Sequence, residues 1–115
     1  MADMQRAIRL LRANKADFRI GDKIVVLGFS AGGMICGNCA THYDNGDASS
    51  EDMIEHYSSR PDACVVCYGA MSEVSFPQPF MMESPENDLF GDTPKDRFYL
   101  APEKNVTPNC PPFFI

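Results

Sequence analysis

Several features that define whole classes of protein are missing from this sequence. It has 10 lysine and arginine residues against 16 aspartate and glutamate residues, a net charge of −6, and no basic cluster that could neutralise phosphates. No apolar run approaches the roughly 18–20 residues that cross a bilayer, and the first residues contain no apolar signal segment. We therefore expect no nucleic-acid partner, no membrane partner and a cytoplasmic location.

The chain also lacks an even set of cysteines and a phosphate-binding loop. Five cysteines do not suit a secreted disulfide framework and fit reduced thiols in the cytoplasm better. No G-x-x-x-x-G-K-[ST] motif is present. With 115 residues there is room for one domain, and the chain stops at Pro111–Ile115, in what reads as the first half of a strand. We expect residues 1–115 to be the central portion of a single domain.

What the sequence does contain is an alternation of helical and strand patterns. In chain order it predicts a helix over 3–16, a strand over 23–29 buried on both faces, a helix over 31–43, a short helix over 50–57, a strand over 62–68, a helical turn over 86–90 and a strand starting at 113. Arg6, Arg9 and Arg12 fall on the polar side of the first helix, and Ser49 or Ser50 could cap the short one. This order predicts an α/β fold with a parallel sheet and helical crossovers.

The most informative stretch joins the first strand to the second helix. Gly28-Phe29-Ser30-Ala31-Gly32 matches the nucleophile elbow G-x-S-x-G, with Gly33 following. We expect a strained backbone at Ser30, with its Oγ above the sheet edge, and glycines at 28 and 32 that avoid side-chain collisions. The N–H of Ala31, at the positive end of the helix, is the expected oxyanion donor. The alternative is a glycine-rich turn with an incidental serine.

Taken together, these motifs resemble those of the α/β-hydrolase esterases, in particular the acetyl-xylan-esterase-like branch of the carbohydrate esterases. The resemblance also rests on Arg60-Pro61-Asp62-Ala63, on Val106-Thr107 and on Pro111-Pro112-Phe113. It implies part of an α/β-hydrolase fold without the N-terminal strands and the C-terminal triad region. It further implies a nucleophilic Ser30, a small-molecule ester substrate such as an acetylated sugar, and no cofactor or metal.

The same resemblance implies a triad in the order Ser, Asp, His, of which this sequence contains only the serine. The upstream glycine-rich loop that supplies the second oxyanion donor is also missing, so we expect the chain alone to be inactive. A dipeptidyl-peptidase-like serine peptidase is the alternative enzyme, because those catalytic domains share this elbow. The oligomeric state is left open.

Three titratable side chains are candidates for the missing triad members. His42 lies twelve residues along the helix that starts after Ser30, about 18 Å away at 1.5 Å per residue. His56 precedes the strand over 62–68 and so belongs to the opposite edge of the sheet. Glu73 follows that strand on the side of Ser30 and could serve as the acid. We interpret both histidines as surface or helix-end residues and Glu73 as a loop carboxylate.

Two C-x-x-C motifs raise a different function, a zinc-binding module without catalysis. The motifs are Cys36–Cys39 and Cys64–Cys67. Residues three apart on a strand point to opposite faces, which separates Cys64 from Cys67. Cys36 lies two turns into its helix, away from the N-terminus that would stabilise a redox thiolate. We interpret these residues as small buried cysteines.

The long segment between the last two strands is rich in large apolar residues. They could line an acyl or sugar pocket, or they could cover the sheet, and the sequence favours neither reading. The residues concerned are Met71, Phe76, Phe80, Met81, Met82, Phe90 and Phe98.

Overall fold

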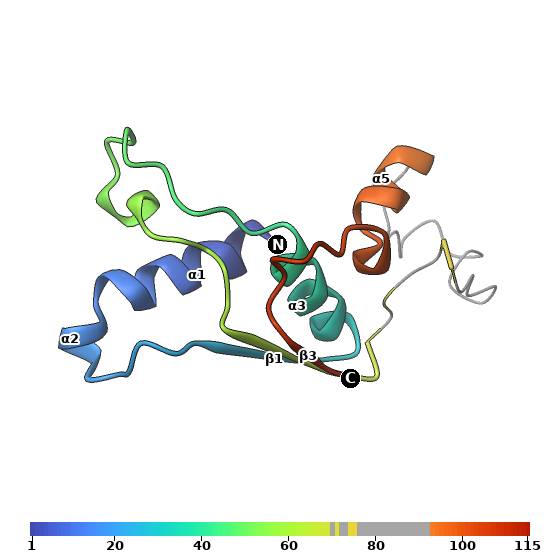
Figure 1. Cartoon of the computed structure of the whole chain (residues 1–115), viewed down its shortest axis with the longest axis horizontal. Helices are drawn as coiled ribbons and strands as arrows, with labels where there is room; N and C mark the ends of the chain where they lie inside the picture. The colour runs from blue at the N-terminus through green and yellow to red at the C-terminus, as the bar shows by residue number, and fades with distance from the viewer. Residues whose placement is uncertain (70, 72–73, 76–92) are drawn as a thin grey trace.

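The fold is a three-stranded parallel sheet under a layer of helices (Figure 1). The computed structural model describes residues 1–69, 71, 74–75 and 93–115. Within these ranges the order is α1 (Ala2–Ala13), α2 (Lys15–Phe18), β1 (Val25–Phe29), α3 (Ala31–Thr41), the 3₁₀ helix η1 (Met53–His56), β2 (Ala63–Cys67), α5 (Pro94–Tyr99), the 3₁₀ helix η2 (Pro102–Lys104) and β3 (Phe113–Phe114). The strand order is β1-β2-β3, and both pairings are parallel. The predicted α/β class and parallel sheet are confirmed.

Across the described ranges, no helix combines the length and the apolar character needed to cross a membrane.

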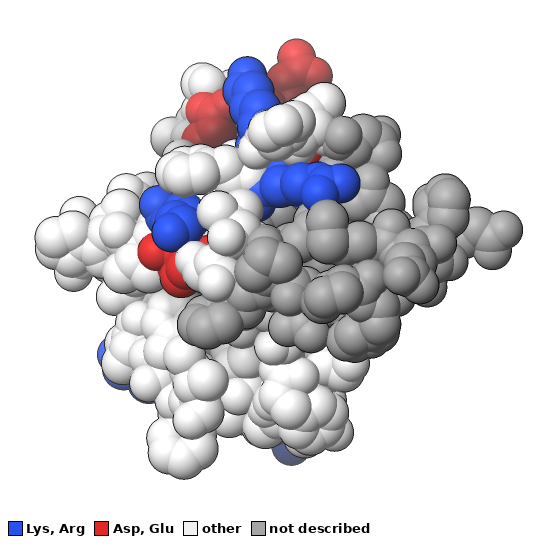
Figure 2. Space-filling view, turned by 90° about the vertical axis from the view of Figure 1, so that its right-hand side faces the viewer, with Lys and Arg blue, Asp and Glu red and all other residues white. Residues whose placement is uncertain are grey.

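Only one face of the sheet is covered within the described part of the chain. Along β1, Val26 is 6% exposed, whereas its neighbours Val25 and Leu27 are 56% and 55% exposed. In Figure 1, α1 and α3 lie above the strands and α5 lies beyond their carboxyl ends, the side that faces the viewer in Figure 2. The prediction that β1 is buried on both faces is therefore wrong here. An unbroken apolar run indicates that both faces suit an apolar neighbour, but one face has no neighbour among the described elements.

The covered face packs closely against α3, as the small residues of that helix predict. A methyl group added at Gly33 would lie 2.9 Å from the Cα atom of Gly69 and 3.1 Å from Val66. The resulting core combines residues of α1, α3 and the sheet: Ile8, Ile24, Val26, Cys36, Cys39, Ala40, Cys64 and Val66. The helix ends at Thr41 rather than at 43. Glycine at 33 is thus required because the strand end and the helix start are in backbone contact.

Several predicted boundaries differ because polar side chains interrupt the helices. The helix predicted over 3–16 is broken at Asn14, whose side-chain amide donates to the carbonyl of Leu10 over 2.9 Å. The helix predicted over 50–57 shrinks to η1, and its cap is Asp52, which accepts from the N–H of Ile54. The predicted caps Ser49 and Ser50 are wrong.

Helix α5 was not predicted, although its start has a clear sequence signal. Thr93 accepts from the N–H of Asp96, Asp96 accepts from the N–H of Thr93, and Pro94 occupies the first turn. This is a capping box, which Thr-Pro-Lys-Asp encodes directly. The helical turn predicted over 86–90 lies outside the described residues.

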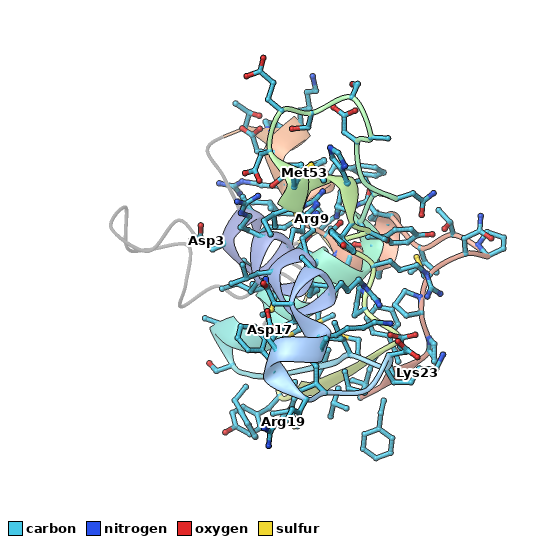
Figure 3. The ribbon with its side chains drawn as sticks, turned by 90° about the vertical axis from the view of Figure 1, so that its left-hand side faces the viewer. Asp3, Arg9, Asp17, Arg19, Lys23 and Met53 are labelled. Atoms are coloured by element: carbon cyan, nitrogen blue, oxygen red, sulfur yellow. The ribbon has the colours of Figure 1, made fainter. Side chains whose placement is uncertain are left out.

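Arg9 is the main exception to the predicted polar face of α1. It is buried, and its guanidinium donates to both carboxylate oxygens of Asp44, over 2.6 and 2.5 Å, and to the carbonyl of Tyr57 over 3.1 Å. Figure 3 shows Arg9 between α1 and the connection that carries Met53. The Arg9–Asp44 pair holds the polar connection 42–62 against α1. Burial of the Arg9 guanidinium without such partners would be costly. The sequence pattern that places Arg9 on the polar side of α1 does not predict that its side chain is buried.

Replacing Arg9 with alanine is expected to destabilise the chain by about 2–3 kcal/mol, because Asp44 and the Tyr57 carbonyl lose their donor. Arg6 provides the matched control. It pairs with Glu55 over 2.6 Å and with Asp52 over 2.7 Å, but its side chain is 43% exposed. Arg6→Ala should cost less than about 1 kcal/mol. Urea unfolding of both variants measures the difference, and equal losses would contradict the role assigned to Arg9.

Candidate active site

Ser30 occupies the turn between β1 and α3 in a conformation that few residues other than glycine adopt. Its backbone angles are φ 51° and ψ −123°. Its N–H donates to the carbonyl of Cys67 over 3.1 Å, and its carbonyl accepts from the N–H groups of Gly33 and Met34 over 2.9 and 3.3 Å. Strain of this kind persists only when surrounding contacts hold it. The predicted strained, exposed position of Ser30 at the carboxyl edge of the sheet matches this geometry.

The two glycines of the elbow have different roles. A methyl group at Gly28 would lie 2.2 Å from the carbonyl oxygen of Gly32 and 2.7 Å from Sγ of Cys36. A methyl group at Gly32 would meet nothing within 4 Å in the described part of the chain. The collision predicted for a side chain at Gly32 is therefore wrong, because a Cβ atom there would point into open space. Gly32 instead limits position 28, since its carbonyl group lies against Gly28. Of these two glycines, Gly28 is the one that sterics require.

At the start of α3, the N–H groups of Gly33 and Met34 donate to the carbonyl of Ser30, whereas the N–H of Ala31 precedes these helical hydrogen bonds. Ser30 caps the helix without a side-chain hydrogen bond, and in the described ranges no group accepts from the N–H of Ala31. An unpaired N–H at the positive end of an eleven-residue helix is suited to stabilise an oxyanion. The role of Ala31 remains a prediction.

The hydroxyl of Ser30 has no hydrogen-bond partner among the described residues, and neither histidine lies beside it. His42 caps the far end of α3, where its Nδ1 lies 3.0 Å from both the carbonyl of Asn38 and Oγ1 of Thr41. His56 belongs to η1, and its Nε2 lies 2.8 Å from the carbonyl of Ser50. Both positions fit the interpretation as structural residues. Glu73 lies outside the described residues.

Of the apolar residues of the long segment, only Met71 and Phe98 are described. Met71 packs over α3, because a methyl group at Gly37 would lie 2.7 Å from its Cε atom. It also borders an apolar hollow of about 250 Å³ with Phe113, Pro102 and Val106. Phe98 is half exposed. Met71 thus covers the helix layer; Phe76, Phe80, Met81, Met82 and Phe90 lie outside the described ranges.

The cysteines of the two C-x-x-C motifs do not form one four-membered set. Cys36, Cys39 and Cys64 are each 0% exposed in the core, while Cys67 points to the other face of β2. Burial raises the pKa of all three core thiols, to about 11 for Cys39 and about 12 for Cys64. The raised pKa values keep these buried thiols protonated. Within the described ranges no group of three or more metal-ligating side chains is suitably placed.

One residue beside Ser30 was missed by the sequence analysis. Tyr68 directly follows β2, and because Phe29 pairs with Cys67, Tyr68 lies next to Ser30 at the sheet edge. Its φ is 40°, a left-handed value that is unusual for an aromatic residue. Its ring lies 5.8 Å from that of Phe29, centroid to centroid. In the sequence, Gly69 is the signal for a turn here, and it packs against Gly33 of α3.

A parallel sheet whose strand β1 turns sharply through a left-handed serine into a tightly packed helix defines an α/β-hydrolase fold. The family comparison agrees: the chain belongs to the BD-FAE family, which matches residues 1–115.

Two known proteins are similar to the chain over almost all of its length. Endo-1,4-beta-xylanase B of Butyrivibrio fibrisolvens is 32% identical over 118 residues, which cover 100% of this chain and 18% of the xylanase. The crystal structure of an acetyl ester-xyloside bifunctional hydrolase from Caldicellulosiruptor lactoaceticus has a TM-score of 0.82 and 34% identity. That match covers 98% of this chain and 41% of the hydrolase. The chain therefore spans less than half of the length of either protein.

Proposed function

We propose that this chain carries the nucleophile of a serine hydrolase that acts on carbohydrate esters, with Ser30 as the attacking residue. The observation that carries the proposal is the left-handed backbone of Ser30 at the strand–helix turn, next to the N–H of Ala31, which has no partner among the described residues. Support for an acetylated sugar comes from the names of the two similar proteins, one a xylanase and one an acetyl ester-xyloside hydrolase.

The proposed reaction follows the two-step course of serine acyl transfer. A base removes the proton from Oγ of Ser30 as the oxygen attacks the ester carbonyl carbon. The N–H of Ala31 donates to the oxyanion of the tetrahedral intermediate. The intermediate collapses to an acyl-enzyme, and the protonated base gives its proton to the departing sugar hydroxyl. Water, deprotonated by the same base, then hydrolyses the acyl-enzyme and regenerates Ser30.

The described residues supply no base, acid or second oxyanion donor, and in this proposal these groups come from other segments of the protein. Among the described residues, no histidine or carboxylate reaches Oγ of Ser30, and both histidines are engaged at other places in the fold. We call residues 1–115 together with these segments the complete hydrolase domain. In this proposal the chain supplies the nucleophile, its geometry and the first oxyanion donor.

A fluorophosphonate probe tests the assignment directly, because it reacts only with an activated serine. In the complete hydrolase domain we expect one equivalent of label on Ser30, found by peptide mass spectrometry, and hydrolysis of a short-chain aryl acetate. Ser49 is an internal control, since it is exposed and bonded to Asp47. Label on another serine, or turnover without label on Ser30, would refute the assignment.

A further inference from the structure

The connection 42–62 contains the one asparagine of the sequence that precedes a glycine, in the dipeptide Asn45–Gly46. This connection is drawn in green above α1 in Figure 1. The side chain of Asn45 is exposed, and its amide has no hydrogen-bond partner among the described residues. Glycine has no Cβ atom that would hinder attack of its nitrogen on the preceding side-chain amide. The dipeptide is therefore the place in this chain where deamidation is chemically easiest.

Deamidation at this position needs only a base from solution and water. Once its proton is lost, the backbone nitrogen of Gly46 attacks Cγ of Asn45, and the bond from Cγ to the amide nitrogen breaks as ammonia leaves. Water then opens the cyclic imide at either carbonyl, which leaves aspartate or isoaspartate at position 45. The nitrogen of Gly46 must therefore be free to lose its proton and to move towards the side chain of Asn45.

A hydrogen bond in the folded chain withholds this nitrogen. The N–H of Gly46 donates to Oδ1 of Asp44 over 2.8 Å. The same carboxylate accepts from the buried guanidinium of Arg9 over 2.6 and 2.5 Å. Loss of the Gly46 proton is disfavoured here, because the resulting anion would lie beside the negative charge of Asp44. The Arg9–Asp44 pair thus fixes the acceptor that keeps Gly46 protonated.

The backbone on both sides of Asn45 is held as well. Gly46 has a φ of 90°, and a methyl group there would lie 2.4 Å from the carbonyl oxygen of His56. On the other side, the N–H of Asp44 donates to Oγ of Ser59 over 2.9 Å. Rotation of the Gly46 nitrogen towards Asn45 breaks these contacts, so the reaction requires local opening of the connection.

We propose that Asn45–Gly46 is a latent deamidation site that the fold keeps closed through the Arg9–Asp44 pair. Opening of the connection exposes the nitrogen of Gly46, and the reaction then prevents full reclosure. Isoaspartate adds a backbone carbon beside Gly46, where the carbonyl of His56 is already close. Aspartate at this position adds a negative charge next to Asp44. A chain whose connection has opened is thereby marked irreversibly.

Incubation of the whole protein at mildly alkaline pH, followed by peptide mass spectrometry, tests the proposal. In urea, Asn45 should deamidate at least about tenfold faster than in the folded protein, since unfolding removes the protection. Arg9→Ala should accelerate the reaction in the folded protein by at least about tenfold. The control Arg6→Ala leaves the Arg9–Asp44 pair in place, so its acceleration should stay below about threefold. Circular dichroism shows whether each variant is folded.

Ser59→Ala is a second variant that decides the matter if Arg9→Ala does not fold. It removes the acceptor of the Asp44 N–H but keeps the Arg9–Asp44 pair, and it should raise the rate at Asn45 by roughly threefold to tenfold. Equal rates at Asn45 in urea and in the folded protein would overturn the proposal. An unchanged rate in either variant, measured in its folded state, would overturn it too.

Discussion

Ser30→Ala in the complete hydrolase domain is expected to lower kcat for an aryl acetate by roughly 10⁵–10⁶-fold, as for other serine nucleophiles that act with a base. The methyl group of alanine cannot form the acyl-enzyme, so only the oxyanion donor and substrate binding would still accelerate the attack of water. The substitution should lower the rate without lowering stability, because Ser30 is exposed and its hydroxyl has no hydrogen bond in the described part of the chain. Steady-state rates with 4-nitrophenyl acetate give the ratio.

The control for this prediction is Ser49→Ala, which removes an exposed hydroxyl bonded to Asp47. We expect its kcat to stay within about twofold of the unsubstituted enzyme, since surface changes of this kind have small effects. A Ser30→Ala variant that keeps more than about one hundredth of the activity would show that another residue is the nucleophile.

The elbow could be predicted from sequence because its determinants are local. Gly28, Ser30 and the small residues after it fix a tight strand–helix turn within a few positions, and the structure shows that geometry. The parallel sheet followed from the same logic, since strands separated by helices pair in parallel. The acyl group, the base and the acid are not local properties of this stretch, and they stay predictions.

The failures share a cause, which is that they depend on contacts distant in sequence. The burial of Arg9 could not be predicted from its place on the polar side of the helix, because it depends on pairing with Asp44, 35 residues later. Tyr68 takes its left-handed conformation where Gly69 packs against Gly33 of α3, a residue far away in the sequence. The two-sided burial predicted for β1 failed for the opposite reason, because the pattern expected a neighbour that the described part of the chain does not contain.

Gly28→Ala should strongly destabilise the chain. The added carbon would lie 2.2 Å from the carbonyl oxygen and 2.4 Å from the carbonyl carbon of Gly32, which are backbone atoms that cannot rotate aside. To relieve the overlap, α3 must move off β1 and open the core between them. We expect a loss of about 3 kcal/mol or more, at the upper end of what overpacking costs. Thermal and urea unfolding measure it.

Two further variants separate the backbone clash from other causes. Gly32→Ala, one turn away in the same motif, has open space at its Cβ and should leave stability unchanged or raise it by up to about 1 kcal/mol, since alanine favours a helix. Cys36→Ala removes the 2.7 Å contact with its Sγ, but it should not restore the Gly28→Ala protein, because the shorter contacts are with the Gly32 backbone. If Cys36→Ala restored the stability of the Gly28→Ala protein, the clash would lie with the Cys36 side chain. The close approach of the α3 backbone to β1 would then not explain the need for glycine at position 28.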